Sequence, residues 1–172
     1  YVKESFVDMY SKNLLDDITI INLKVAPNTL QKNNPKLLVS KEIQVSSNTK
    51  NIKIIRDETE KVCNILNFTK QETFETKLAI NEAQANIIEH AYFGSNKGDI
   101  IIKYEGYSTY LKITIKDFGQ SFKQQTTKSK DHHLTEIEGS GLGLFLIRSF
   151  IDEIHREKIP NGTKLILIKK RK

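Results

Sequence analysis

The stretch that decides the fold is residues 74–92, FETKLAINEAQANIIEHAY. At 3.6 residues per turn it is apolar round most of its circumference, which predicts a largely buried helix. Glu75, Glu82, Asn86 and Glu89 nevertheless share one narrow stripe, with Glu82 and Asn86 one turn apart. Buried acids and mid-helix asparagines need a metal ion, a water molecule or a ligand as partner. The helix alone leaves open the alternative of a solvated face with ordinary surface residues.

Two glycine-containing segments follow the helix. DFGQS (117–121) ends a predicted strand, and GSGLGL (139–144) opens a predicted helix. In this order, the three segments resemble the N, G1 and G2 boxes of the ATP-binding fold shared by gyrases, Hsp90-type chaperones, histidine kinases and MutL. The wording LAINEAQANIIEHAY is most similar to bacterial anti-sigma-factor serine kinases, and the resemblance covers roughly residues 40–170. It implies a Bergerat-type ATP-binding fold, with ATP and Mg²⁺ as cofactors.

The resemblance also implies a role for each box. Asn86 would give its amide oxygen to Mg²⁺, and Glu82 would act as the general base beside the terminal phosphate. Asp117 would accept a hydrogen bond from the adenine amino group, and Gly119 would let the chain turn beside the base. The glycines of the third box remove side chains where backbone N–H groups bind phosphate. The remaining predicted nucleotide-binding residues are Gly139, Ser140, Gly141, Leu142, Gly143 and Thr163.

The chain departs from the family pattern at two positions. Ser121 stands where a second glycine is usual, and Gly139 stands where the related kinases often carry an arginine. Another cation of the segment between the glycine boxes could supply that charge, and the candidates are Lys123, Lys128, Lys130, His132 and His133.

Hydrophobic periodicity predicts an α+β protein, a two-layer sandwich in which helices cover one face of a mixed or antiparallel sheet. Strands are expected at residues 37–45, 99–105, 110–116 and 163–168, and helices at 49–66, 69–92 and 142–154. The polar segment 120–138 lacks a regular period and is expected to be a loop.

The first residues suggest a different origin. DDITIINLKV (16–25) predicts a strand over 18–25 and resembles the last motif of PPM-type serine phosphatases, in which the residue matching Asp16 ligates the catalytic metal. Because the other metal carboxylates of that family are absent, an active phosphatase is not favoured. The predicted organisation is a phosphatase-like remnant at 1–26, a linker at 27–36 and an ATP-binding kinase domain at 37–172.

Composition narrows the class of function. The 172-residue chain carries a net charge of +6, but its lysines are scattered except at residues 169–172, a run typical of a solvated strand end. With no tryptophan to stack on bases, nucleic-acid binding is not favoured. Cys63 lies among apolar residues and is expected to be a core residue. No apolar run approaches twenty residues, so we expect no membrane association and a cytoplasmic location.

The resulting hypothesis is an ATP- and Mg²⁺-dependent protein serine kinase. By resemblance it phosphorylates an anti-sigma-factor antagonist, sequesters a sigma factor when it is not engaged, and pairs as a homodimer. The alternative is a non-catalytic, nucleotide-sensing binding module of a phosphatase-switch fusion protein. The catalytic half of a histidine kinase is not favoured, because His90 lies inside the central helix and no helix with a phosphoacceptor histidine precedes the domain.

Overall fold

A single antiparallel sheet forms one layer of the protein. The structure, a computed structural model, describes residues 18–24, 35–119 and 141–172. Within them the strands follow the spatial order β1-β2-β3-β4-β6-β5, and every neighbouring pair is antiparallel. Their bounds are β1 Ile18–Lys24, β2 Leu37–Ser46, β3 Asp99–Tyr107, β4 Tyr110–Asp117, β5 Glu153–Ile159 and β6 Gly162–Lys170.

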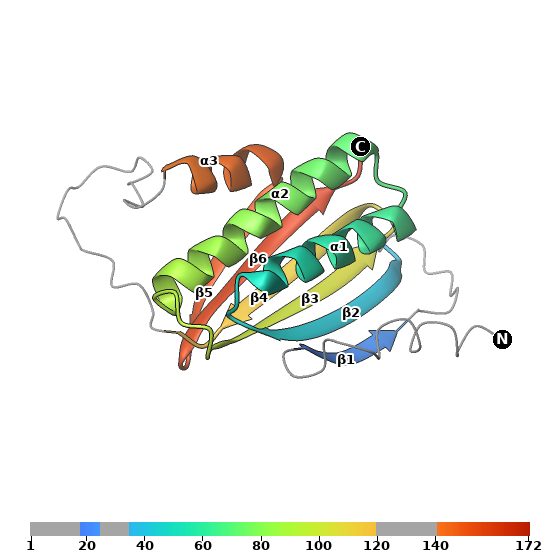
Figure 1. Cartoon of the computed structure of the whole chain (residues 1–172). Coiled ribbons are helices and arrows are strands. Elements are labelled where there is room, and N and C mark those ends of the chain that lie inside the picture. Colours follow the sequence, from blue (N-terminus) through green and yellow to red (C-terminus); the bar gives the residue numbers. More distant parts are fainter. Residues whose placement is uncertain (1–17, 25–34, 120–140) are drawn as a thin grey trace.

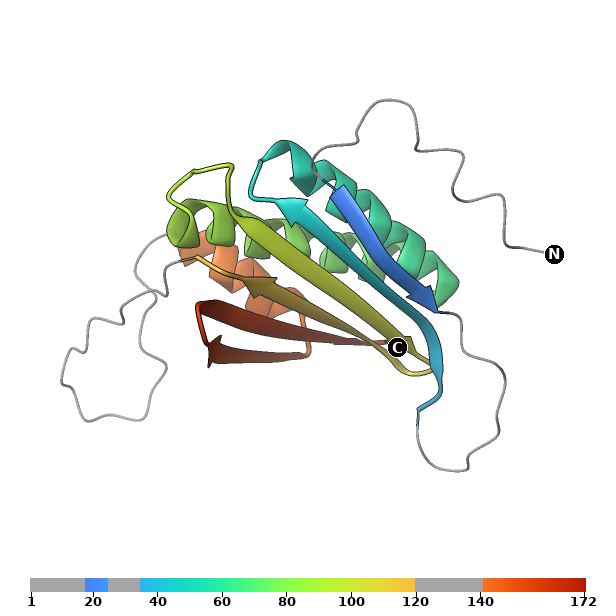
Figure 2. The ribbon, with the colours of Figure 1, turned by 90° about the horizontal axis from the view of Figure 1, so that it is seen from below.

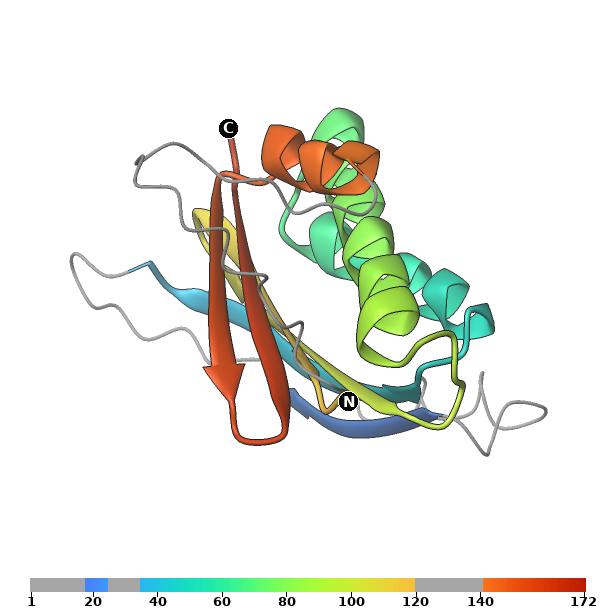
Figure 3. The same ribbon diagram turned by 90° about the vertical axis from the view of Figure 1, so that its left-hand side faces the viewer.

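Helices form the second layer. α1 (Lys50–Ile65) and α2 (Lys70–Asn86) lie side by side on one face of the sheet, and α3 (Gly141–Phe150) packs beside α2 (Figures 1 and 3). Seen from below, the strands lie in front of the helices, and none of the described helices covers this other face (Figure 2). The predicted α+β two-layer fold is confirmed.

The core lies between the two layers, because alternate strand residues point toward the helices. Ile43 of β2, Ile102 of β3, Ile113 of β4 and Leu167 of β6 are fully buried there. Cys63 of α1 joins this core as expected, and burial raises the pKa of its thiol to about 12. The cysteine is therefore a neutral core residue rather than a nucleophile.

The central helix begins with a reciprocal cap. The hydroxyl of Thr69 accepts a hydrogen bond from the backbone N–H of Glu72, whose carboxylate accepts one from the N–H of Thr69. At its other end, the single helix predicted to reach residue 92 is wrong: α2 ends at Asn86 and continues as a π-helical turn, η1, over Ile87–Ala91. Such turns are rare, and they occur often at functional sites.

The predicted helix over 142–154 is also too long. α3 ends at Phe150, and β5 pairs with β6 as a hairpin. Asn161 closes the turn with a φ of 62°, a left-handed conformation that asparagine adopts more readily than most residues. The strand escaped prediction because β5 lies at the edge of the sheet and most of its residues are exposed, so it lacks a clear alternation of apolar and polar residues.

Two expectations about burial are wrong. Phe74, predicted on an apolar side of a buried helix, is 58% exposed. Lys169, predicted within a solvated strand end, is only 4% exposed, and its ammonium group donates to Glu75 (2.6 Å) and to the carbonyl oxygen of Phe150 (2.8 Å). The side chain of Arg171 likewise donates to the carbonyl oxygen of Leu66 (3.0 Å), so part of the basic C-terminal run holds the helices to β6.

The strand predicted over 18–25 is observed as β1, which pairs with β2 in the same sheet as the other strands. Asp16 lies outside the described residues. The division into a remnant at 1–26, a linker at 27–36 and a kinase domain at 37–172 stays a prediction.

Candidate nucleotide-binding site

The first turn of α3 lies directly against the central helix. A Cβ atom on Gly143 would lie 2.7 Å from Oε2 of Glu82 and 3.7 Å from Nδ2 of Asn86, and the first of these distances is shorter than a non-bonded contact allows. A side chain at this position would therefore push the Glu82 carboxylate aside, and glycine lets this turn lie close to the two polar side chains. The glycine-rich segment and the acidic stripe of α2, predicted from separate parts of the sequence, meet at one place.

A cavity of about 260 Å³ opens between α2, η1, α3 and the hairpin of β5 and β6. Most of its lining is apolar, and the polar groups lie at a few positions, as is typical of small-molecule sites. The lining residues are Ala83, Asn86, Ile87, His90, Ala91, Asp117, Leu144, Ile147, Arg148, Ile154, Arg156, Thr163 and Leu165.

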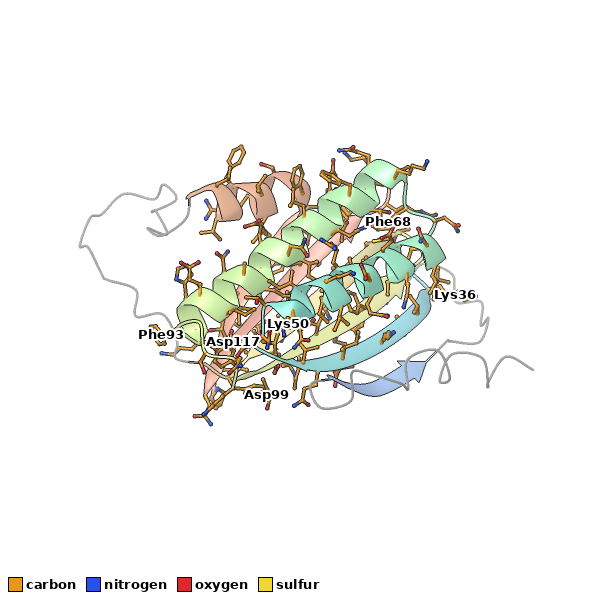
Figure 4. All side chains as sticks on the ribbon, viewed as in Figure 1. Lys36, Lys50, Phe68, Phe93, Asp99 and Asp117 are labelled. Atoms are coloured by element: carbon orange, nitrogen blue, oxygen red, sulfur yellow. The ribbon has the colours of Figure 1, made fainter. Side chains whose placement is uncertain are left out.

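Asp117 provides the buried carboxylate of this cavity. It is the last residue of β4, is 4% exposed, and lies at the same end of the sheet as Phe93, which follows η1 (Figure 4). Burial raises the pKa of its carboxyl, and the N–H groups of Gly119 and Thr163 and the charge of Arg156 partly offset this increase. The N–H of Gly119 donates to Oδ1 at 3.2 Å, which fixes the side chain as an acceptor in the cavity.

The strand beside Asp117 is held very close to it. Thr163 lies opposite Asp117 in the register of β4 and β6, and it lines the same cavity. At Gly162 an added Cβ atom would lie 1.9 Å from the carbonyl oxygen of Asp117. Glycine at this position therefore lets β6 place Thr163 next to the carboxylate.

The π-helical turn fixes the segment that follows Asp117. The hydroxyl of Tyr92 accepts a hydrogen bond from the N–H of Phe118 (2.7 Å) and donates one to the carbonyl oxygen of Asp99. An added Cβ atom on Gly119 would lie 2.4 Å from the carbonyl oxygen of Ala91. The start of the first glycine-containing segment, residues 117–121, is therefore packed tightly on η1, and neither Tyr92 nor Ala91 was among the predicted site residues.

The structure brings several of the predicted site residues together. Asn86, Asp117 and Thr163 line the cavity, while Glu82 and Gly143 contact each other just beyond Asn86. Leu142 does not line the cavity, and its side chain is 70% exposed. Gly141 begins α3. The remaining predicted residues and the two departures lie outside the described residues: Gly139, Ser140, Ser121 and the cations between 120 and 140.

Two arginines of the cavity were missed from the sequence. Arg148 lies on α3 and Arg156 on β5, and neither belongs to any of the three boxes. For Arg156 a signal existed: had the turn at Asn161 and Gly162 been taken as a hairpin, the preceding residues would have been assigned to a strand beside Thr163. For Arg148 no comparable signal is present in the sequence.

These residues fit a magnesium nucleotide. The apolar walls suit a base, and Asp117 is an acceptor that can pair with an amino group. Mg²⁺ keeps several waters and takes few ligands from the protein, so one amide oxygen from Asn86 together with phosphate oxygens is a reasonable donor set. The described residues contain no cluster of three or more His, Cys, Asp or Glu side chains that could hold a metal.

Comparison with known protein families defines the class. Residues 45–169 match the histidine kinase-like ATPase domain family, a span of most of the chain. The chain therefore belongs to the histidine kinase-like ATPase domain family, whose members bind ATP.

Among individual proteins, the chain is similar to the serine-protein kinase RsbW of Staphylococcus aureus. The two are 35% identical over 129 residues, which cover 71% of this chain and 81% of the relative. The same kinase from strain JH9 is 35% identical over 120 residues, which cover 66% of this chain and 76% of the relative. The predicted class of ATP-dependent protein serine kinase is confirmed by these matches.

A solved structure also matches: the histidine kinase domain of the blue-light activated histidine kinase from Erythrobacter litoralis EL346. Its TM-score is 0.46 at 13% sequence identity, and the match covers 73% of this chain and 61% of that chain.

None of the helices in the described part of the chain is long and apolar enough to cross a bilayer.

Proposed function

We propose that this chain transfers the γ-phosphoryl group of ATP to a serine of an anti-sigma-factor antagonist, with Mg²⁺ held through Asn86 and with Glu82 as the general base. The observation that carries the proposal is the close approach of Gly143, in the first turn of α3, to the side chains of Glu82 and Asn86, the second of which lines the cavity. The related serine-protein kinases support the same reaction.

The proposed binding mode follows from the two ends of the cavity. Asp117 and Thr163 mark the base end, where the carboxylate accepts a hydrogen bond from the adenine amino group and so selects adenine over guanine. Backbone N–H groups at the start of α3, with Gly141 and Gly143 giving close access, bind the phosphates. Gly119, Leu142, Gly139 and Ser140 complete the proposed nucleotide-binding set.

The proposed transfer is a displacement at the γ-phosphorus. The hydroxyl oxygen of the partner's serine forms a bond to the γ-phosphorus, while the bond from that phosphorus to the bridging β,γ-oxygen breaks and ADP leaves. Glu82 orients the attacking hydroxyl and takes its proton. Bound Mg²⁺ neutralises the charge that develops on the phosphate oxygens.

The proposed partners are the antagonist as substrate and a sigma factor as the protein held when the antagonist is absent. A homodimer in the cytoplasm is part of the same proposal.

The experiment is to incubate the chain with Mg²⁺, γ-labelled ATP and a candidate antagonist. We expect label on a serine of the antagonist. Glu82→Ala should reduce transfer about 10²- to 10⁴-fold, the usual contribution of a positioned general base, while ATP affinity by calorimetry stays close to wild type. Glu89→Ala removes an exposed acid from the same stripe and should leave transfer unchanged.

Nucleotide binding by the wild type without transfer to any antagonist would instead identify a nucleotide-sensing binding module. Equal transfer by Glu82→Ala and the wild type would contradict the assigned base.

A further inference from the structure

Arg156 lies on the edge strand β5, and its side chain lines the cavity. On β5 it lies opposite Leu165 of β6, and both residues line the cavity together with Ile154. The other cations of this strand do not line it: His155 alternates to the other face, and Lys158 lies at the end near the turn. Arg156 is therefore the positively charged residue that the described part of β5 contributes to the cavity lining.

The strand register locates Arg156 near the base end of the cavity. Thr163 is opposite Asp117, and Leu165 is two residues further along β6. Two strand spacings across and two residues along put the Cα atoms of Arg156 and Asp117 roughly 12 Å apart, a gap that a long arginine side chain largely spans. In agreement with this placement, the charge of Arg156 lowers the pKa of the Asp117 carboxyl.

The phosphate end lies elsewhere. Gly143 and Glu82 contact each other beyond Asn86, and neither lines the wall that Arg156 shares with Leu165. Arg156 therefore lies on a different part of the site from the contact between Gly143 and Glu82, near which backbone N–H groups would hold the anionic oxygens.

The surroundings of Arg156 favour a flat, uncharged ligand face. Its strand partner Leu165 is an apolar residue of the cavity lining, and so is Ile154, two residues before it on the same face of β5. A guanidinium is planar and weakly hydrated, and it stacks well on π systems. Beside an apolar wall, this group suits the face of a purine ring better than it suits a phosphate.

We propose that Arg156 lies over the purine ring of the bound nucleotide and contributes to affinity by stacking on the base, independently of the number of phosphates. This inference rests on the proposed function in one respect, the assignment of Asp117 to the base end. It adds a nucleotide-binding residue on β5 that lies outside the three sequence boxes.

The test is a ligand series measured by calorimetry on the whole chain. Adenosine, AMP, ADP and Mg·ATP are titrated into the wild type and into Arg156→Met. We expect the dissociation constant to rise by about 3- to 30-fold, the range for a cation stacked on an aromatic face, and by the same factor for all four ligands.

Two further variants separate stacking from charge and from folding. Lys158→Met removes a positive charge from the same strand away from the cavity lining, and all four affinities should stay at the wild-type value. Arg156→Lys keeps the charge without the planar group, and it should weaken all four ligands in the same direction by a smaller factor.

A loss that grows from adenosine to ATP would overturn the proposal in favour of a phosphate contact. Unchanged affinities in a folded Arg156→Met would overturn it as well. A separate measurement tests the assignment of Asp117 to the base end. If the wild type bound GTP as tightly as ATP, the proposed role of Asp117 would be contradicted, whereas the affinities of the Arg156 variants would still test the stacking.

Discussion

The two ends of α2 both carry acidic and amide side chains, but these side chains differ in how far the protein satisfies their hydrogen bonds. At the first end, Glu72 accepts hydrogen bonds from the N–H groups of Thr69 and Lys172, and Glu75 accepts one from Lys169. In the second half of the helix, Oδ1 of Asn81 and Nε2 of Gln84 are buried without a hydrogen-bond partner among the described residues.

The difference separates a structural end from a proposed functional end. Hydrogen bonding to Lys169 lowers the pKa of the Glu75 carboxyl, and the pKa of Glu72 is also low, although burial alone would raise it, because backbone N–H groups donate to its carboxylate. These acids are stabilised as charges by the protein itself. Natural proteins leave few buried polar groups without a hydrogen-bond partner. The two unpaired atoms therefore distinguish the second half of α2, where the protein does not satisfy all of the buried polar groups.

The largest effect is expected from a change at the functional end that adds one methyl group. Gly143→Ala places a Cβ atom against Oε2 of Glu82, which must move away. Because a displacement of about 1 Å in a catalytic geometry can cost about 10²-fold, transfer of label from ATP to the antagonist should fall by that order. Alanine favours a helix interior over glycine by about 1 kcal/mol, so unfolding is not the expected cause.

The matched control for this variant is Phe145→Ala, an exposed position of α3 outside the cavity lining, which should leave transfer within twofold of wild type. Wild-type rates in both variants would show that the close contact of α3 with Glu82 has no part in the reaction.

A smaller effect is expected from Asp117→Asn at the base end. Replacing a charged acceptor by a neutral one should weaken adenosine binding by about 10- to 30-fold, the usual contribution of a hydrogen bond to a charged group. Asp99→Asn, an exposed position at the start of β3, should bind adenosine as the wild type does. Equal affinities for adenosine in Asp117→Asn and the wild type would contradict the assigned acceptor.

The same variant gives a pH test. In the proposed binding mode the ionised carboxylate of Asp117 is the acceptor, so its contribution to binding is present above its pKa and is lost as the pH falls through that value. Burial raises this pKa above that of an ordinary aspartate. As the pH is lowered, the affinity of the wild type for adenosine should therefore begin to fall at a higher pH than it would if Asp117 had an ordinary pKa. Calorimetry across the acidic range should show no such fall in Asp117→Asn.

Much of this site could be predicted from local sequence. Glu82 and Asn86 share a face because they lie one helical turn apart, and Asp117 was placed by the end of an alternating strand. The contact of Gly143 with Glu82 could not be derived from periodicity, since it depends on how α3 packs on α2. Resemblance to a family anticipated that meeting, but the distances required the structure.

The parts that escaped prediction share a physical cause. β5 pairs only through β6 and carries mostly exposed side chains, so no alternation marks it, and Arg156 was lost with it. In the sequence, Lys169 is one of several cations in a basic run. Its burial could not be predicted, because it depends on pairing with Glu75, 94 positions away in the chain. Long-range partners of this kind leave no local pattern.

The smallest effect is expected at the structural end, from Lys169→Met. The variant removes the donor to Glu75 and to the carbonyl oxygen of Phe150, and it should lower the free energy of unfolding by about 1.5 kcal/mol. The melting temperature should fall by about 4 °C, while the maximal rate of transfer stays near wild type. Lys170→Met breaks only the exposed pair with Glu153 and should cost at most about 0.5 kcal/mol.

Acid sharpens this last comparison. The low pKa of Glu75 in the folded state means that its pairing stabilises the wild type above the pKa of an unfolded glutamate, and the contribution is lost as the pH falls through the folded value. Denaturant unfolding of the wild type and Lys169→Met should therefore differ most near neutral pH and converge in acid. A loss of transfer in Lys169→Met with an unchanged melting temperature would show that the basic C-terminal run serves the reaction, and the contrast between the two ends of α2 would then fail.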